Sequence, residues 1–177
     1  MKLVILDRDG VINYDSESYI KSADEWRPLP GAVEAIAKLT QAGYHVVVAT
    51  NQSGIGRGLF EMATLNAIHD RMYRAVTQAG GRIDAVFYCP HGQEANCDCR
   101  KPKPGLYEEI GRRFNTLLKD VPAIGDALRD LQAAAATGAQ PILVLTGKGA
   151  RTQQEGGLPP GTRVYPDLAA AVKFITR

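Results

Sequence analysis

Short apolar runs alternate with segments of helical periodicity along almost the whole chain. The first run, Leu3 to Leu6, is apolar at every position, which is typical of a strand buried on both faces. We expect strands at residues 3–6, 44–49, 83–88, 123–124, 142–145 and 163–165, and helices at 32–42, 65–80, 105–118, 128–137 and 167–175, with loops at 51–58, 89–104 and 147–161. This alternation predicts one α/β domain over residues 1–177, a parallel sheet with helices on both faces.

Length and charge exclude several classes of protein. The chain has 177 residues, 45% hydrophobic and 23% charged, which suits one globular domain. Its net charge is 21 − 19 = +2, which gives little long-range attraction for nucleic acid. No apolar run approaches the ~18 residues of a membrane span, and the short first run does not resemble a signal peptide. We therefore expect a cytoplasmic monomer with neither nucleic acid nor a membrane as a partner.

Polar side chains follow the predicted strands at the points where the strands end. The carboxyl ends of parallel strands meet at one edge of a sheet, where ligands bind in folds of this class. We therefore expect the polar residues after four strands to share one rim: Asp7 and Asp9, Thr50 to Ser53, Cys89, and Asp126.

Asp7 and Asp9 stand two residues apart, so in an extended segment both carboxylates point the same way. Asp126 approaches from another strand end, and Asp130 lies one helical turn beyond it. Carboxylates gathered in this way repel one another, and Mg²⁺ relieves the repulsion while leaving room for phosphate oxygens. The alternative is that each aspartate only caps the helix or turn that follows its strand.

Four motifs in order resemble those of haloacid-dehalogenase-type phosphatases. They are Asp7 to Val11, Thr50–Asn51, Arg100 to Pro102, and Gly125–Asp126 with Asp130. The resemblance covers nearly the whole chain and implies a three-layer Rossmann-like fold. The segments between the motifs each already hold a helix and a strand, so no separate cap domain fits and loops must select the substrate.

The resemblance also implies a role for each motif residue. Asp7 is expected to attack phosphorus and form an aspartyl-phosphate, while Asp9 acts as general acid and then as general base. Mg²⁺ is expected to bind the Asp7 carboxylate, the Asp9 main-chain carbonyl and Asp126. Thr50 and Lys101 are expected to stabilise the transferring phosphoryl group.

Three assignments stay open at this point. Lys101 and Lys103 both precede a proline, so either could be the phosphoryl lysine, and relatives with a metal loop favour Lys101. Arg57 is either a phosphate anchor or a solvated loop residue. Asp130 is either part of the acidic site or a helix cap.

Soft and borderline metal ligands cluster in one short segment. They form a Cys₃His set that is typical of structural zinc: Cys89, His91, Cys97 and Cys99. The one-residue spacings are unusual for zinc, but a disulfide explains the pattern less well, because three cysteines leave one unpaired. We expect zinc to hold the loop at 89–99 and so to orient Arg100 and Lys101.

The metal loop and the first two motifs narrow the resemblance to phosphatases that remove the C7 phosphate of a heptose 1,7-bisphosphate. By analogy, the substrate should contact Asp15, Ser16, Glu17, Ser18, Asn51, Gln52, Ser53 and Arg100. The alternative enzyme is a histidinol-phosphate phosphatase. A different alternative is an inactive, zinc-stabilised interaction module.

Overall fold

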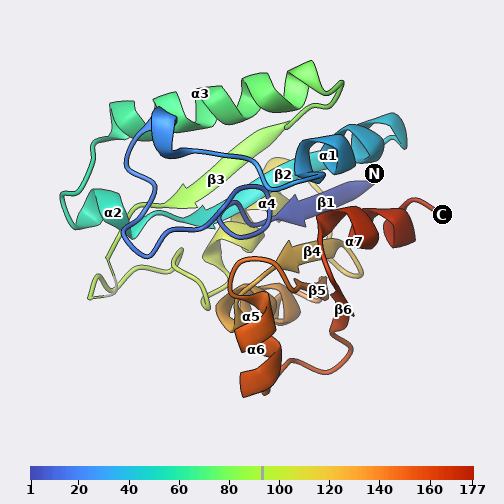
Figure 1. Ribbon diagram of the computed structural model, residues 1–177. Helices are drawn as coiled ribbons and strands as arrows, with labels where there is room; N and C mark the ends of the chain where they lie inside the picture. The colour runs from blue at the N-terminus through green and yellow to red at the C-terminus, as the bar shows by residue number, and fades with distance from the viewer. Residues whose placement is uncertain (93) are drawn as a thin grey trace.

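A six-stranded parallel sheet forms the centre of the computed structural model, which describes residues 1–92 and 94–177 (Figure 1). The strand order is β3-β2-β1-β4-β5-β6. The strands are β1 (Leu3–Leu6), β2 (His45–Asn51), β3 (Ala85–Cys89), β4 (Pro122–Gly125), β5 (Gln140–Val144) and β6 (Arg163–Tyr165). Every neighbouring pair is parallel, so all carboxyl ends lie on the same edge.

Helices cover both faces of this sheet. They are η1 (Ala23–Glu25), α1 (Ala32–Gln41), α2 (Ser53–Gly56), α3 (Met62–Gln78), α4 (Gly105–Arg113), α5 (Leu128–Ala136), α6 (Gly149–Glu155) and α7 (Leu168–Ile175). Figure 1 shows α1 and α3 on one side of the strands and α5 on the other. In the described part of the chain, no helix combines the length and the apolar character needed to cross a bilayer.

Alternate residues of the central strands divide the core into two layers. Val4 and Leu6 of β1 face a cluster that includes Ile36 of α1 and Met72 of α3. The intervening side chains face a second cluster, built from Leu3, Ile5, Val47 and Ala49 with the apolar faces of α4 and α5. Side chains on both faces of β1 are therefore fully apolar, and the predicted parallel α/β fold is confirmed.

Three element predictions differ from the structure. The segment 147–161 contains the helix α6, which sequence patterning misses because only Gly149 and Thr152 of its seven residues are buried. A single short turn of helix, α2, lies within the expected loop at 51–58. Helix α4 ends at Arg113 rather than at 118, and the chain then turns through Asn115 at a positive φ of 48°.

Candidate active site

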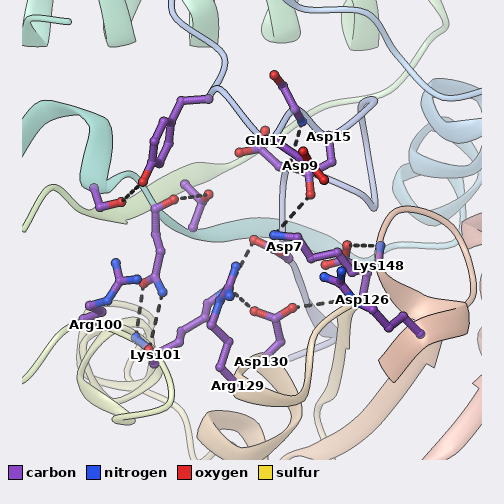
Figure 2. A pocket seen from close by; sticks show the side chains of 16 residues that line it. Asp7, Asp9, Asp15, Glu17, Arg100, Lys101, Asp126, Arg129, Asp130 and Lys148 are labelled. Atoms are coloured by element: carbon purple, nitrogen blue, oxygen red, sulfur yellow. Dashed lines mark hydrogen bonds and ion pairs between the residues drawn. The ribbon is translucent and has the colours of Figure 1, made fainter. Parts of the chain in front are cut away.

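A polar cavity of about 300 Å³ opens at the carboxyl edge of the sheet (Figure 2). The ends of β1, β2 and β4 meet there, as the strand-end argument predicts. Most of the predicted site residues line it: Asp7, Asp9, Asp15, Ser16, Glu17, Thr50, Asn51, Ser53, Arg100, Lys101 and Asp126.

Three buried carboxylates form the floor of the cavity. Oxygen atoms of Asp7, Asp126 and Asp130 all lie within 4.8 Å of one another. Burial, with Asp130 nearby, raises the pKa of Asp7 to about 7 although Lys101 opposes the shift. Burial, with Asp7 nearby, raises the pKa of Asp126 to about 8. Because ionisation is unfavourable for both groups, this oxygen-rich cluster suits a hard divalent cation such as Mg²⁺.

Main-chain and hydroxyl groups fix Asp126 in this cluster. The amide of Lys148 donates a hydrogen bond to Asp126 Oδ2 (2.9 Å), and the Thr152 hydroxyl donates to the Asp126 main-chain oxygen (2.8 Å). Gly10 has a positive φ of 85°, and a Cβ at this position would collide with the Asp126 carboxylate. Glycine after the two motif aspartates therefore lets the first loop approach Asp126 closely.

Lys101 joins two of the carboxylates. Its Nζ lies 3.2 Å from Asp7 Oδ1 and 3.0 Å from Asp130 Oδ1, and it donates a third hydrogen bond to the Ala49 carbonyl (2.6 Å). Burial alone would lower the pKa of Lys101, but Asp130 and Asp7 raise it above its usual value. Lys103 is exposed and its Nζ donates instead to a carbonyl in the cysteine loop (2.9 Å). Of the two candidate lysines, Lys101 is thus the one that contacts the buried carboxylates.

Asp130 combines the two roles that the sequence leaves open. Its Oδ2 accepts hydrogen bonds from the amides of Asp126 (3.2 Å) and Ala127 (3.1 Å), so it caps the first turn of α5. Its Oδ1 meanwhile binds Lys101. Burial would raise the pKa of Asp130, but Lys101 and Arg129 outweigh it and hold the pKa below its usual value.

Hydrogen-bond donors surround the carboxylate of Asp9. Its Oδ1 accepts from Arg8 Nε (2.8 Å) and Asn13 Nδ2 (2.9 Å), and its Oδ2 accepts from Arg8 Nη2 (3.1 Å) and Gln52 Nε2 (3.2 Å). Burial alone would raise the pKa of Asp9, but these partners together lower it below its usual value. The carboxylate is therefore ionised and held in one orientation.

The end of β2 connects the cavity to the cysteine loop. Thr50 is buried at the cavity wall, and Asn51 Oδ1 accepts a hydrogen bond from the Lys101 amide (3.1 Å). Gln52 does not line the cavity. It lies beneath it, where its Nε2 also donates to Thr50 Oγ1 (3.0 Å).

The loop after β1 forms the opposite wall. Asp15 Oδ2 lies 3.3 Å from Lys148 Nζ, and the Ser53 hydroxyl lies 3.5 Å from the Tyr19 hydroxyl, which joins the loop to α2. Ser18 lies outside the lining and its side chain is exposed, whereas Tyr19 lines the cavity. The Ser18 amide donates to Ser16 Oγ (3.2 Å), which makes a local turn here.

Basic residues that sequence reasoning missed also line the cavity: Arg129, Lys148 and Arg151. Arg129 lies in the first turn of α5, directly before Asp130 in the sequence. In Figure 2, Arg100 and Arg129 both lie along the lower part of the cavity. Burial lowers the pKa of Arg100, and the positive charge of Arg129 adds to this effect. Arg100 Nη1 is buried without a hydrogen-bond partner among the described residues. Two guanidinium groups thus line the same cavity.

The four predicted zinc ligands come together beside the active site. Cys89 Sγ lies 3.4 Å from His91 Nδ1 and 3.6 Å from Cys97 Sγ, and Cys99 Sγ lies 3.4 Å from the same histidine nitrogen. Tetrahedral zinc, with bonds of about 2.3 Å to sulfur and 2.0–2.1 Å to nitrogen, separates its ligand atoms by roughly 3.4–3.8 Å. The cluster has the size and the donor set of such a site. Gln93, within the same loop, lies outside the described residues.

Known families and proteins match this chain over most of its length. A family described as HAD-hydrolase-like matches residues 98–171, and one described as polynucleotide kinase 3 phosphatase matches residues 2–134. A protein of Bordetella bronchiseptica named D-glycero-beta-D-manno-heptose-1,7-bisphosphate 7-phosphatase is 61% identical over 98% of this chain and 97% of its own length. A protein of Pseudomonas putida with the same name is 54% identical over 98% of both chains.

Solved structures extend the comparison to the fold. The crystal structure of D,D-heptose 1,7-bisphosphate phosphatase from B. bronchiseptica, complexed with magnesium and phosphate, has a TM-score of 0.98 at 60% identity, and covers 99% of this chain and 98% of that one. The corresponding phosphatase of Burkholderia thailandensis has a TM-score of 0.80 at 54% identity, with full coverage of both chains. The chain therefore belongs to the D-glycero-beta-D-manno-heptose-1,7-bisphosphate 7-phosphatase family of HAD-like hydrolases.

Proposed function

We propose that this protein is a magnesium-dependent phosphatase that removes the C7 phosphate of D-glycero-β-D-manno-heptose 1,7-bisphosphate. The products are heptose 1-phosphate and inorganic phosphate. The observation that carries this proposal is the full-length identity of 61% to a relative of that name, together with the site of Asp7, Asp126 and Lys101. An inactive interaction module would have no reason to keep three carboxylates buried beside a lysine, because buried charges are costly.

The reaction begins with attack of an Asp7 carboxylate oxygen on the phosphorus of the 7-phosphate. The bond between phosphorus and the C7 oxygen breaks, and the leaving oxygen takes a proton from the Asp9 carboxyl group. Lys101 and Thr50 stabilise negative charge on the transferring group. Mg²⁺ held by Asp7, Asp126 and the main-chain carbonyl of Asp9 would supply further positive charge and offset the repulsion among the carboxylates.

In the second half of the reaction, Asp9 takes a proton from water, and the water oxygen attacks the phosphorus of the aspartyl-phosphate. The bond between phosphorus and the Asp7 oxygen breaks, which restores the Asp7 carboxylate and releases inorganic phosphate. This step needs the ionised form of Asp9, which the hydrogen bonds from Arg8, Asn13 and Gln52 favour. The first step needs the protonated form. A phosphate group that enters beside Asp9 brings negative charge, which favours uptake of that proton.

The rest of the substrate lies along the two loop walls of the cavity. Asp15, Ser16 and Glu17 offer acceptors for sugar hydroxyl groups, and their position in the lining supports this role. Arg100 and Arg129 face the second phosphate of the bisphosphate. A guanidinium group suits this task because its planar donors match the oxygens of a phosphate.

Zinc has a structural role in this proposal. Four protein ligands leave no open position for catalysis, and the loop contributes few apolar side chains of its own. Its ligand cluster leads directly into Arg100 and Lys101, so a bound zinc ion would fix both side chains relative to Asp7. We also propose a cytoplasmic monomer formed by a single domain, which size-exclusion chromatography would test.

A phosphate-release screen tests the proposed activity directly. The substrates are heptose 1,7-bisphosphate, histidinol phosphate and an aryl phosphate, each with and without Mg²⁺. We expect magnesium-dependent release that is fastest from the heptose bisphosphate. Faster hydrolysis of histidinol phosphate would identify the alternative enzyme, and no release from any ester would identify the interaction module.

A further inference from the structure

We propose that His69 and Arg8 are positioning residues for this reaction, because His69 orients the Arg8 guanidinium that holds Asp9 in place for proton transfer. The inference rests on the proposed acid–base role of Asp9 and extends it to a residue on α3, outside the cavity. It is carried by a continuous chain of three hydrogen-bonded groups.

The Arg8 side chain is completely buried, which is rare for an arginine unless its charge is paired. Two of its nitrogens, Nε and Nη2, hold the two oxygens of Asp9 at 2.8 and 3.1 Å. A paired contact of this kind fixes the plane of the carboxylate as well as its distance. The orientation of Asp9 therefore depends on the orientation of Arg8.

The remaining Arg8 nitrogen, Nη1, lies 3.1 Å from Nε2 of His69. A guanidinium group can only donate hydrogen bonds, so His69 Nε2 must accept this one and the ring is neutral. Burial, together with the charge of Arg8, lowers the pKa of His69 to about 3, which agrees with that assignment. His69 thus offers a fixed lone pair to one of the Arg8 donors.

The His69 side chain is itself buried. It is 6% exposed and projects from the buried face of α3, between Leu65 and Met72. Loss of its nitrogen would leave an Arg8 donor buried without a partner. The guanidinium group would then shift toward other acceptors and carry Asp9 with it, and a displacement of that kind slows proton transfer.

The chemistry offers a readout that a purely structural role would not affect. An alkoxide from a sugar is a poor leaving group and needs the proton from Asp9, whereas dinitrophenolate leaves as an anion. The ratio kcat/KM reports the steps up to formation of the aspartyl-phosphate. Poor positioning of Asp9 should therefore lower kcat/KM for the sugar phosphate and spare the dinitrophenyl ester.

The test compares His69→Leu with His69→Gln, using heptose 1,7-bisphosphate and 2,4-dinitrophenyl phosphate. Leucine removes the acceptor, and glutamine retains an oxygen near the position of Nε2. For His69→Leu we expect kcat/KM to fall about tenfold with the heptose and less than about twofold with the dinitrophenyl ester, a fraction of the 10²–10⁴ that a general acid contributes. His69→Gln should recover most of the lost activity.

Asp9→Asn is the reference that separates this inference from the proposed function. This variant should lose more kcat/KM with the heptose than His69→Leu does, and should again lose little with the dinitrophenyl ester. If Asp9→Asn shows no such dependence on the leaving group, the acid–base role of Asp9 itself is wrong. If Asp9→Asn shows the dependence but His69→Leu loses activity equally on both esters, or loses none, the positioning role is wrong. If His69→Leu does not fold, Arg8→Met removes the contacts to Asp9 that His69 is proposed to orient, and it must give the same dependence on the leaving group.

Discussion

Asp7, Lys101 and Asp130 lie far apart in the sequence, but Lys101 Nζ lies within 3.2 Å of both carboxylates. The motif residues predict this meeting because each follows a strand or the cysteine loop, and these segments end at the same edge of the sheet. What the sequence cannot predict is how the supporting side chains point. Gln52 lies beneath the cavity rather than in its wall, and Arg129 enters it, because the rotation of a helix or turn decides which side chain faces inward.

The covalent step depends on a single oxygen nucleophile. Asp7→Asn should abolish turnover, because an amide does not attack phosphorus, and should also prevent the enzyme from binding trifluoroberyllate as a phosphate mimic. Fluorine NMR and a phosphate-release assay measure the two effects. Asp9→Asn should slow turnover while the mimic still binds. Substantial turnover by Asp7→Asn would contradict the proposal that Asp7 is the nucleophile.

The two guanidinium groups should matter only for substrates with a second phosphate. Arg100→Ala and Arg129→Ala should each lower kcat/KM for the bisphosphate by roughly ten- to a hundredfold, since a charge-assisted contact is worth about 1.5–3 kcal/mol. The loss with an aryl phosphate should stay below about threefold. Arg112→Ala, on the exposed side of α4, is the matched control. Equal losses on both esters would show instead that these arginines serve the phosphoryl site.

At the scale of elements, sequence patterns located the buried strands well and the exposed helices poorly. The run of valines in β2 is apolar on both faces and cannot be mistaken for a loop. Helix α6 carries no apolar stripe, because it is fixed largely by polar contacts such as that of Thr152 with the Asp126 carbonyl. The cysteine loop has neither helical periodicity nor an apolar face, yet the gathering of its four Cys and His side chains is predictable, because metal binding requires particular residue types.

The structural zinc ion that we propose would make the cysteine loop sensitive to any change among its four ligands. His91→Gln should reduce zinc from about one ion per chain to near zero and lower the Tm by at least ~5 °C, because metal binding contributes directly to folding free energy. Elemental analysis and calorimetry are the measurements. His45→Gln changes a histidine outside the loop and should alter neither. Full stability of a zinc-free protein would refute the site.

For the whole molecule, the parallel sheet brings three aspartates together at its carboxyl edge. A bound Mg²⁺ ion would offset the repulsion among them and so stabilise the fold. Mg²⁺ at about 100 times its Kd should stabilise the protein by ~2.7 kcal/mol, or about 5–10 °C in Tm. Asp126→Asn should remove most of this shift, whereas Asp24→Asn, which changes an exposed aspartate outside the cavity, should retain it. A Tm that does not respond to Mg²⁺ in the wild type would contradict a magnesium site at this edge.

The central claim concerns which phosphate leaves, and phosphorus NMR of the reaction with heptose 1,7-bisphosphate tests it most directly. The 7-phosphate should lie against Asp7, Thr50 and Lys101, with the anomeric phosphate toward Arg100 and Arg129. The spectrum should therefore show the C7 ester signal replaced by inorganic phosphate while the anomeric signal persists. Loss of the anomeric signal first would contradict the proposed orientation of the substrate and the function drawn from it.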